Sequence, residues 1–127
     1  MKEKTKSQLR KDLDKIFSLY IRQRYANEYG IVRCYTCPKT SHWKKMQCSH
    51  FVPRQYLATR YDEVNCQVGC YACNMLYNGQ PSAFAKNLER GYGKGTVEML
   101  EAKRQKVMPS FDYVGFIEIY KEKLKNL

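Results

Sequence analysis

The chain has 127 residues, of which 23 are Lys or Arg and 12 are Asp or Glu, so its formal charge at pH 7 is +11. This length suits one domain with a single modest core, and a hydrophobic share of 43% with 13% aromatic residues excludes a disordered basic tail. The apolar runs are shorter than the roughly 20 residues that a membrane span needs, and the surplus positive charge predicts a polyanionic partner, either nucleic acid or anionic lipid.

The first predicted element is an amphipathic helix over residues 7–25 that ends near Gly30. Basic residues separate its apolar positions, so we expect one face to pack on the core and the other to be solvated. Tyr20 and Tyr25 lie on the apolar stripe and are expected in the core. The other apolar residues that recur at helical spacing are Leu9, Leu13, Ile16, Phe17 and Ile21.

The N-terminal stretch, residues 1–7, is rich in charge and leads into no apolar stretch. We therefore expect no secretory signal and a location in the reducing cytoplasm. In that compartment paired cysteines favour metal binding over disulfides.

The middle segment, residues 34–80, holds all six cysteines and both histidines among clustered Pro, Gly and Asn, which predicts turns and short strands. Within it Cys34 and Cys37 are separated by two residues, as are Cys70 and Cys73. That spacing lets a tight turn present two thiolates to one ion, and two such turns complete a tetrahedral zinc site. Because all four ligands come from the protein, the predicted zinc is structural.

Cys48 and Cys66 are left outside this set. They are either small buried core residues or members of a second site with His42 or His50. His42 stands beside Trp43, the only tryptophan, and is expected to be a surface or partly buried turn residue next to an aromatic side chain that packs on the zinc region.

Three further helices are predicted towards the C-terminus. The first enters at Pro81 and ends at residues 91–93, the second covers 96–106, and the third follows Ser110 as N-cap and reaches Leu124. The last helix, with Phe111, Phe116, Ile117, Tyr120 and Leu124, supplies either a dimer interface or a cover for the core of a monomer.

The middle segment resembles the HNH nucleases, also called His-Me finger or ββα-metal nucleases, and is most similar to the phage NinG (Rap) recombination nucleases. A more distant likeness is to phage endonuclease VII, which has a four-Cys zinc site with an Asn directly after the last Cys. The residues that carry the resemblance are His50 in Cys48-Ser49-His50-Phe51, Asn65 after Asp62-Glu63-Val64, Asn74 after Cys73, and the flanking Phe17–Arg22, Phe51–Arg54, Arg60–Asp62 and Asn78-Gly79.

The resemblance implies an α+β fold: a zinc-stapled ββα-metal core over about 31–90, an N-terminal helix over about 7–25 and C-terminal helices over about 96–125, all in one domain of residues 1–127. It implies metal-dependent hydrolysis of DNA phosphodiesters. His50 would be the general base, Asn74 a ligand of a catalytic Mg²⁺ or Mn²⁺, and Asn65 a positioning residue that bonds backbone to hold the His50 loop.

One departure from the family pattern concerns the metal ligands. Many HNH enzymes have Asp or His directly before the base, whereas this chain has Ser49. Asp62 and Glu63, the only carboxylates between Cys34 and Asn74, are expected to be solvated. The ion is then held either by Asn74 with water and phosphate, or with help from Gln47 or Cys48, and we expect weak binding without DNA.

The DNA contacts are expected from basic residues, namely Arg54, Arg60, Lys44 and Lys45, with Arg54 favoured because it lies four residues from His50. NinG-like relatives act on branched recombination intermediates, so Holliday junctions and displacement loops are the implied substrates, in the bacterial host cytoplasm if the protein is phage-encoded. The two-fold symmetry of a junction suits a homodimer. The alternatives are a non-catalytic zinc module that binds DNA or a protein partner, and a general HNH nicking or packaging nuclease.

Overall fold

The computed structural model describes residues 3–127, which adopt an α+β fold of helices and two small sheets. The elements in chain order are α1 (Lys6–Gln23), β1 (Ile31–Arg33), β2 (Thr40–His42), a 3-10 helix (Trp43–Lys45), β3 (Gln47–His50), α2 (Leu57–Arg60), β4 (Cys66–Gly69), a π-helical turn (Ala72–Leu76), α3 (Pro81–Tyr92), α4 (Thr96–Lys103) and α5 (Tyr113–Lys125). The turns and short strands predicted for the middle segment are present, together with three short helical elements that were not predicted: the 3-10 helix, α2 and the π-helical turn. No helix within these residues is long and apolar enough to cross a membrane.

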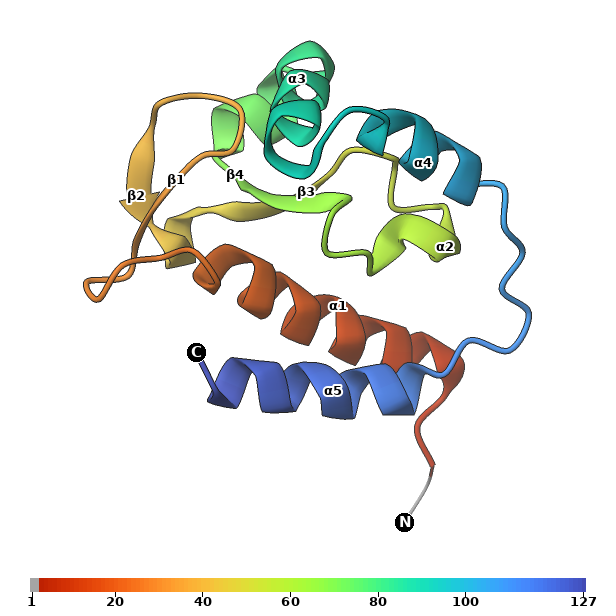
Figure 1. Ribbon diagram of the computed structural model, residues 1–127. Helices are drawn as coiled ribbons and strands as arrows, with labels where there is room; N and C mark the ends of the chain where they lie inside the picture. Colours follow the sequence, from red (N-terminus) through yellow and green to blue (C-terminus); the bar gives the residue numbers. More distant parts are fainter. Residues whose placement is uncertain (1–2) are drawn as a thin grey trace.

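The strands form two antiparallel pairs, β1 with β2 and β3 with β4. In the second pair Cys48 faces Val68 and His50 faces Cys66 across the ladder. Helix α1 lies against one side of this pair with α5 packed on α1, and α3 and α4 lie on the opposite side of the pair (Figure 1). All four residues of β4 are buried, as expected of a strand that is covered on both faces.

The N-terminal helix follows its predicted amphipathic pattern. Thr5 accepts a hydrogen bond from the backbone of Gln8 and the Gln8 side chain bonds back to Thr5, which forms a capping box. Leu13, Phe17 and Ile21 are buried on one face. Burial of each such side chain stabilises the fold by about 1.5–3 kcal/mol.

Helices α1 and α5 pack side by side and run in the same direction (Figure 1). Arg10 bonds the hydroxyl of Tyr113 near their starts, and the Tyr20 and Tyr120 rings lie 5.4 Å apart near their ends. Ile117 and Tyr120 are buried in this seam. The sequence left two roles open for this last helix, and its buried side chains cover the core of the chain itself.

Three predicted boundaries differ from the structure. Helix α1 ends at Gln23, so Tyr25 falls in a turn and is 62% exposed, which makes its assignment to the core wrong. Helix α4 ends at Lys103, before the predicted residue 106. The N-cap of α5 is Asp112, whose carboxylate accepts from the backbone of Gly115, and not Ser110.

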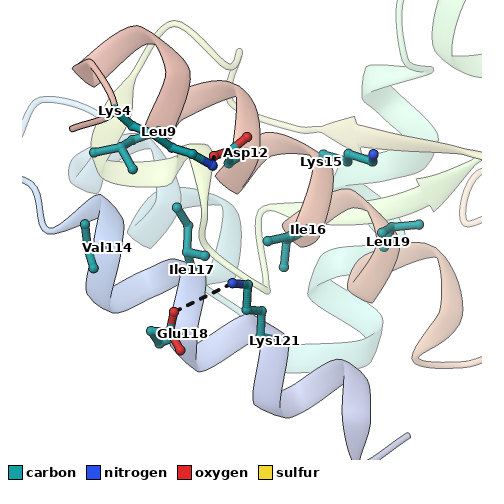
Figure 2. Close-up of a pocket in the computed structure, with 10 residues that line it drawn as sticks. All are labelled: Lys4, Leu9, Asp12, Lys15, Ile16, Leu19, Val114, Ile117, Glu118 and Lys121. Carbon is teal, nitrogen blue, oxygen red and sulfur yellow. Dashed lines mark hydrogen bonds and ion pairs between the residues drawn. The ribbon is translucent and has the colours of Figure 1, made fainter. Parts of the chain in front are cut away.

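The solvent side of the α1–α5 seam carries a groove of about 430 Å³ (Figure 2). Leu9, Ile16 and the buried Ile117 supply apolar lining, and charged side chains also line the groove, among them Glu118 and Lys121, which pair at 3.8 Å. No His, Cys or amide side chain lines it. The residues predicted to act chemically lie elsewhere.

Candidate metal centre and candidate active site

The four paired cysteines converge as the sequence predicts. Cys34 and Cys37 come from the connection between β1 and β2, and Cys70 and Cys73 from the end of β4 and the π-helical turn. Their Sγ atoms all lie within 4.8 Å of one another, and those of Cys37 and Cys70 are 3.7 Å apart. A tetrahedral zinc with bonds of about 2.3 Å places its sulfurs about 3.8 Å apart, so the cluster can hold a metal ion such as zinc.

The surroundings of the sulfurs also fit a cation. Burial would raise the pKa of Cys34, but hydrogen bonds from the Thr36 hydroxyl and from the backbone N–H of Cys70 lower it to about 6. Burial, together with the neighbouring thiols, raises the pKa of Cys37 to about 12. Four thiolates in this space therefore need a bound cation to offset their charges.

An apolar shell that includes Val32, Met46 and Val68 surrounds this cluster, with Trp43 packed against it as predicted. His42 stands beside Trp43, with ring centroids 5.4 Å apart, and its Nδ1 accepts from the backbone of Lys44 at 3.2 Å. His42 is partly buried, as the sequence indicates, but it is the last residue of strand β2 and not a turn residue, and it belongs to neither cysteine cluster.

A separate cavity of about 360 Å³ brings together four of the other predicted site residues. Its lining includes His50, Asn74, Arg54 and Arg60. A neighbouring hollow of about 470 Å³ shares His50, Arg54 and Asn74. His50 therefore stands where two hollows meet, a position that an extended ligand can reach from either side.

The hydrogen bonding of His50 fixes its tautomer. Its Nε2 lies 3.0 Å from the carbonyl oxygen of Arg60, which can only accept, so Nε2 carries the proton and Nδ1 keeps a lone pair. Burial lowers the pKa of His50 below its ordinary value, and the positive charges of Arg54 and Arg60 lower it further. His50 is therefore neutral at physiological pH and able to accept a proton at Nδ1.

Asn74 is held by two strand residues. Its Oδ1 accepts from the Ser49 hydroxyl at 2.8 Å, and its Nδ2 donates to Gln47 Oε1 at 2.6 Å. A Cβ at Gly69 would overlap Ser49 Oγ, so glycine there leaves room for this hydroxyl. An amide oxygen has two lone pairs, and Asn74 Oδ1 keeps one for a further partner.

Asn65 is fully buried and ties the segment that follows His50 to the start of β4. Its Oδ1 accepts from the backbone N–H of Val52 at 2.8 Å. Its Nδ2 donates to the carbonyl oxygens of Val52 at 3.1 Å and Thr59 at 3.0 Å. These are backbone bonds of the kind expected of a positioning residue.

The residue that sequence reasoning missed is Asp14, a carboxylate from α1 that lines the His50 cavity. It accepts from Arg60 at 3.0 and 2.6 Å and from the Tyr61 hydroxyl at 2.6 Å. Asp14, Ser18 and Arg22 recur every four residues along α1, beside its apolar stripe, and all three line the cavity. That polar stripe is the signal that the sequence offered.

The four basic residues predicted to contact DNA occupy different environments. The Arg60 guanidinium is committed to Asp14, with a side chain 12% exposed, whereas that of Arg54 is 67% exposed and only 3.4 Å from the same carboxylate. Lys44 and Lys45 are exposed on the 3-10 helix and do not line the cavity. Arg54 is the predicted contact that is both exposed and at the cavity.

The expectation that Asp62 and Glu63 are solvated is wrong. Asp62 accepts from the backbone of Val64 at 2.8 Å and pairs with Lys103. Glu63 accepts from the Tyr120 hydroxyl at 2.8 Å and from Lys123 at 2.7 Å. Both carboxylates therefore connect the turn before β4 to the C-terminal helices.

Comparison with known proteins identifies the family of this chain. The family model described as bacteriophage lambda NinG protein matches residues 1–127. Neither the curated proteins nor the solved structures contain a match to the chain. Because the family match spans the whole chain, the protein belongs to the NinG family.

Proposed function

We propose that this protein is a metal-dependent endonuclease that hydrolyses phosphodiesters in branched DNA, namely Holliday junctions and displacement loops. The observation that carries the proposal is His50, a neutral histidine whose Nε2 is bonded to a backbone carbonyl while Nδ1 keeps its lone pair, in a cavity with basic walls. Membership of the NinG family and the resemblance to HNH nucleases supply the reaction class and the substrate class.

The order of elements around the cavity supports an HNH-type core. The antiparallel strands β3 and β4 are followed by the π-helical turn, with His50 at the end of β3 and Asn74 in that turn. Both residues line the same two hollows. In this proposal the pair and the turn are the ββα-metal unit, and the four-cysteine zinc cluster fixes the turn against β4.

The proposed chemistry begins with a proton transfer at His50 Nδ1. A water beside this nitrogen gives up its proton as its oxygen attacks phosphorus, and the Arg60 carbonyl stabilises the proton that remains on Nε2. Asn65 keeps the segment after His50 in place through its bonds to Val52 and Thr59. The bond to the 3′ oxygen of the leaving nucleotide breaks as the new bond forms.

The ligand set suits a weakly held hard cation. Asn74 Oδ1 offers its second lone pair, while Gln47 is engaged by Asn74 and Asp14 by Arg60 and Tyr61. A bound Mg²⁺ or Mn²⁺ would neutralise charge on the phosphate and on the leaving oxygen. The phosphate and water would supply the remaining ligands, so DNA and cation would bind together.

DNA would be held mainly through its phosphates. Arg54 is exposed beside His50, and Arg22 lines the same cavity with its Nε bonded to the Ser18 hydroxyl at 3.0 Å. Lys44 and Lys45 extend the basic surface on the 3-10 helix. Contacts of this kind give affinity that falls steeply with salt and little sequence readout.

The test compares the zinc-loaded wild type with His50→Ala and His42→Ala on a labelled four-way junction and on linear duplex of matched sequence, in Mg²⁺ or Mn²⁺. The proposal predicts junction cleavage by the wild type and by His42→Ala, the matched histidine control, and its loss in His50→Ala. Equal cleavage of both substrates would favour a general nicking enzyme. Binding without cleavage of either would leave a non-catalytic zinc module and overturn the proposal.

A further inference from the structure

A second group of metal-ligating side chains lies directly beside the proposed base. Cys48 and His50 are two residues apart on β3 and so point to the same face of the strand, and Cys66 faces His50 across the ladder. One ligand atom from each of the three lies within 4.8 Å of the others. This cluster shares no residue with the four-cysteine zinc cluster.

We infer that Cys48, His50 and Cys66 form a second metal site, for a soft divalent cation such as Zn²⁺ or Cd²⁺, and that its occupation switches off the proposed nuclease. Two thiolates and an imidazole are ligands that zinc and cadmium prefer and that Mg²⁺ avoids. The binding site stands on this geometry alone, whereas its inhibitory role rests on the proposed function.

The cavity gives an ion access to this site, and a backbone carbonyl beside the site can supply the fourth ligand. Cys48 is half-buried and lines both hollows beside His50, which gives an ion a path from solvent. The carbonyl oxygen of Arg60 lies 3.0 Å from His50 Nε2 and 3.3 Å from Cys66 Sγ. An ion that replaces the protons of Nε2 and Sγ would keep this oxygen or a water at its fourth position.

Charge and protons balance in the binding step. The thiols of Cys48 and Cys66 each release a proton to solvent, and their two negative charges neutralise the divalent ion. The imidazole stays neutral: Nε2 binds the ion through a lone pair, and the ring proton moves to Nδ1. The nitrogen that accepts the water proton in the proposed reaction is then already protonated, so the ion inhibits without blocking DNA.

The binding test counts ions. The full-length protein, reduced and then saturated with Cd²⁺, is analysed by native mass spectrometry and by ¹¹³Cd NMR after removal of free ion. We expect two ions per wild-type chain with two distinct resonances, and one ion in Cys48→Ser and in His50→Ala. Ser18→Ala, which alters the same cavity without removing a ligand, should keep two. One ion in the wild type, or two in both ligand variants, would overturn the inference.

The inhibition test is kept separate so that the two proposals fail independently. Zn²⁺ is titrated into junction cleavage reactions that contain excess Mg²⁺ and protein with its four-cysteine cluster already loaded. We expect wild-type cleavage to stop as the second ion binds, and Cys48→Ser to need at least tenfold more Zn²⁺. Cleavage unaffected by the second ion would refute the regulatory role, whereas absence of cleavage without added Zn²⁺ would refute the nuclease and leave the ion count to decide the site.

Discussion

Replacing Asn65 tests how the fold holds the segment that follows the candidate base. The side chain is fully buried and makes three hydrogen bonds, to the N–H and carbonyl of Val52 and to the carbonyl of Thr59. Val52 and Thr59 are also fully buried, so water cannot replace the lost partner at either residue. At about 1 kcal/mol for each bond, Asn65→Ala is expected to lower the free energy of unfolding by about 3 kcal/mol, and by up to about 5 kcal/mol with the cavity it leaves.

Asn65→Asp separates hydrogen bonding from volume. The carboxylate keeps an acceptor for Val52 N–H but turns its second oxygen towards two carbonyl oxygens, so this nearly isosteric change should destabilise at least as much as Asn65→Ala. Urea unfolding of the zinc-loaded proteins under reducing conditions measures both. Asn126→Ala, at an exposed helix end, is the control and should change stability by less than about 0.5 kcal/mol. A loss below about 1 kcal/mol in Asn65→Ala would refute the reasoning.

Three further predictions concern the metal sites and the electrostatics of the cavity. Chelation of zinc, or the substitution Cys37→Ser, should unfold the segment between the two cysteine pairs. We expect the circular dichroism signal to fall, and added zinc to restore it in the wild type. A signal that chelation leaves unchanged would contradict this. Arg54→Ala removes a positive charge near His50 and so should raise the pKa of His50, which moves the acid limb of the cleavage pH profile to higher pH, though only slightly because Arg54 is exposed; a shift to lower pH would contradict this. Calorimetric titration of free protein with Mg²⁺ should show only weak binding, and tight binding would refute the ligand set in which Asn74 is the main protein donor.

The features that the sequence predicted well depend on neighbours along the chain. Two residues between cysteines set the geometry of each turn. The helical spacing of Leu13, Phe17 and Ile21 is enough to predict that they share one buried face. The end of α1 at Gln23 was missed because Tyr25 continues the apolar spacing beyond the last helical turn.

The features that the sequence left open depend on contacts between distant segments. Asp14 lines the cavity and pairs with Arg60, 46 residues along the chain, so this arginine is not a free phosphate contact. The cluster of Cys48, His50 and Cys66 exists because the register of β3 on β4 sets His50 opposite Cys66. Neither the pairing nor the register can be predicted from the spacing of residues along one segment.

The central claim is that His50 accepts the proton of the attacking water. The most direct measurement is the single-turnover rate of four-way junction cleavage by zinc-loaded wild type and His50→Ala, at saturating Mg²⁺ or Mn²⁺ and with junction affinity measured separately. Loss of a general base predicts a rate about 10²–10⁴ lower in His50→Ala at unchanged junction affinity. Cleavage by His50→Ala at the wild-type rate would contradict the account.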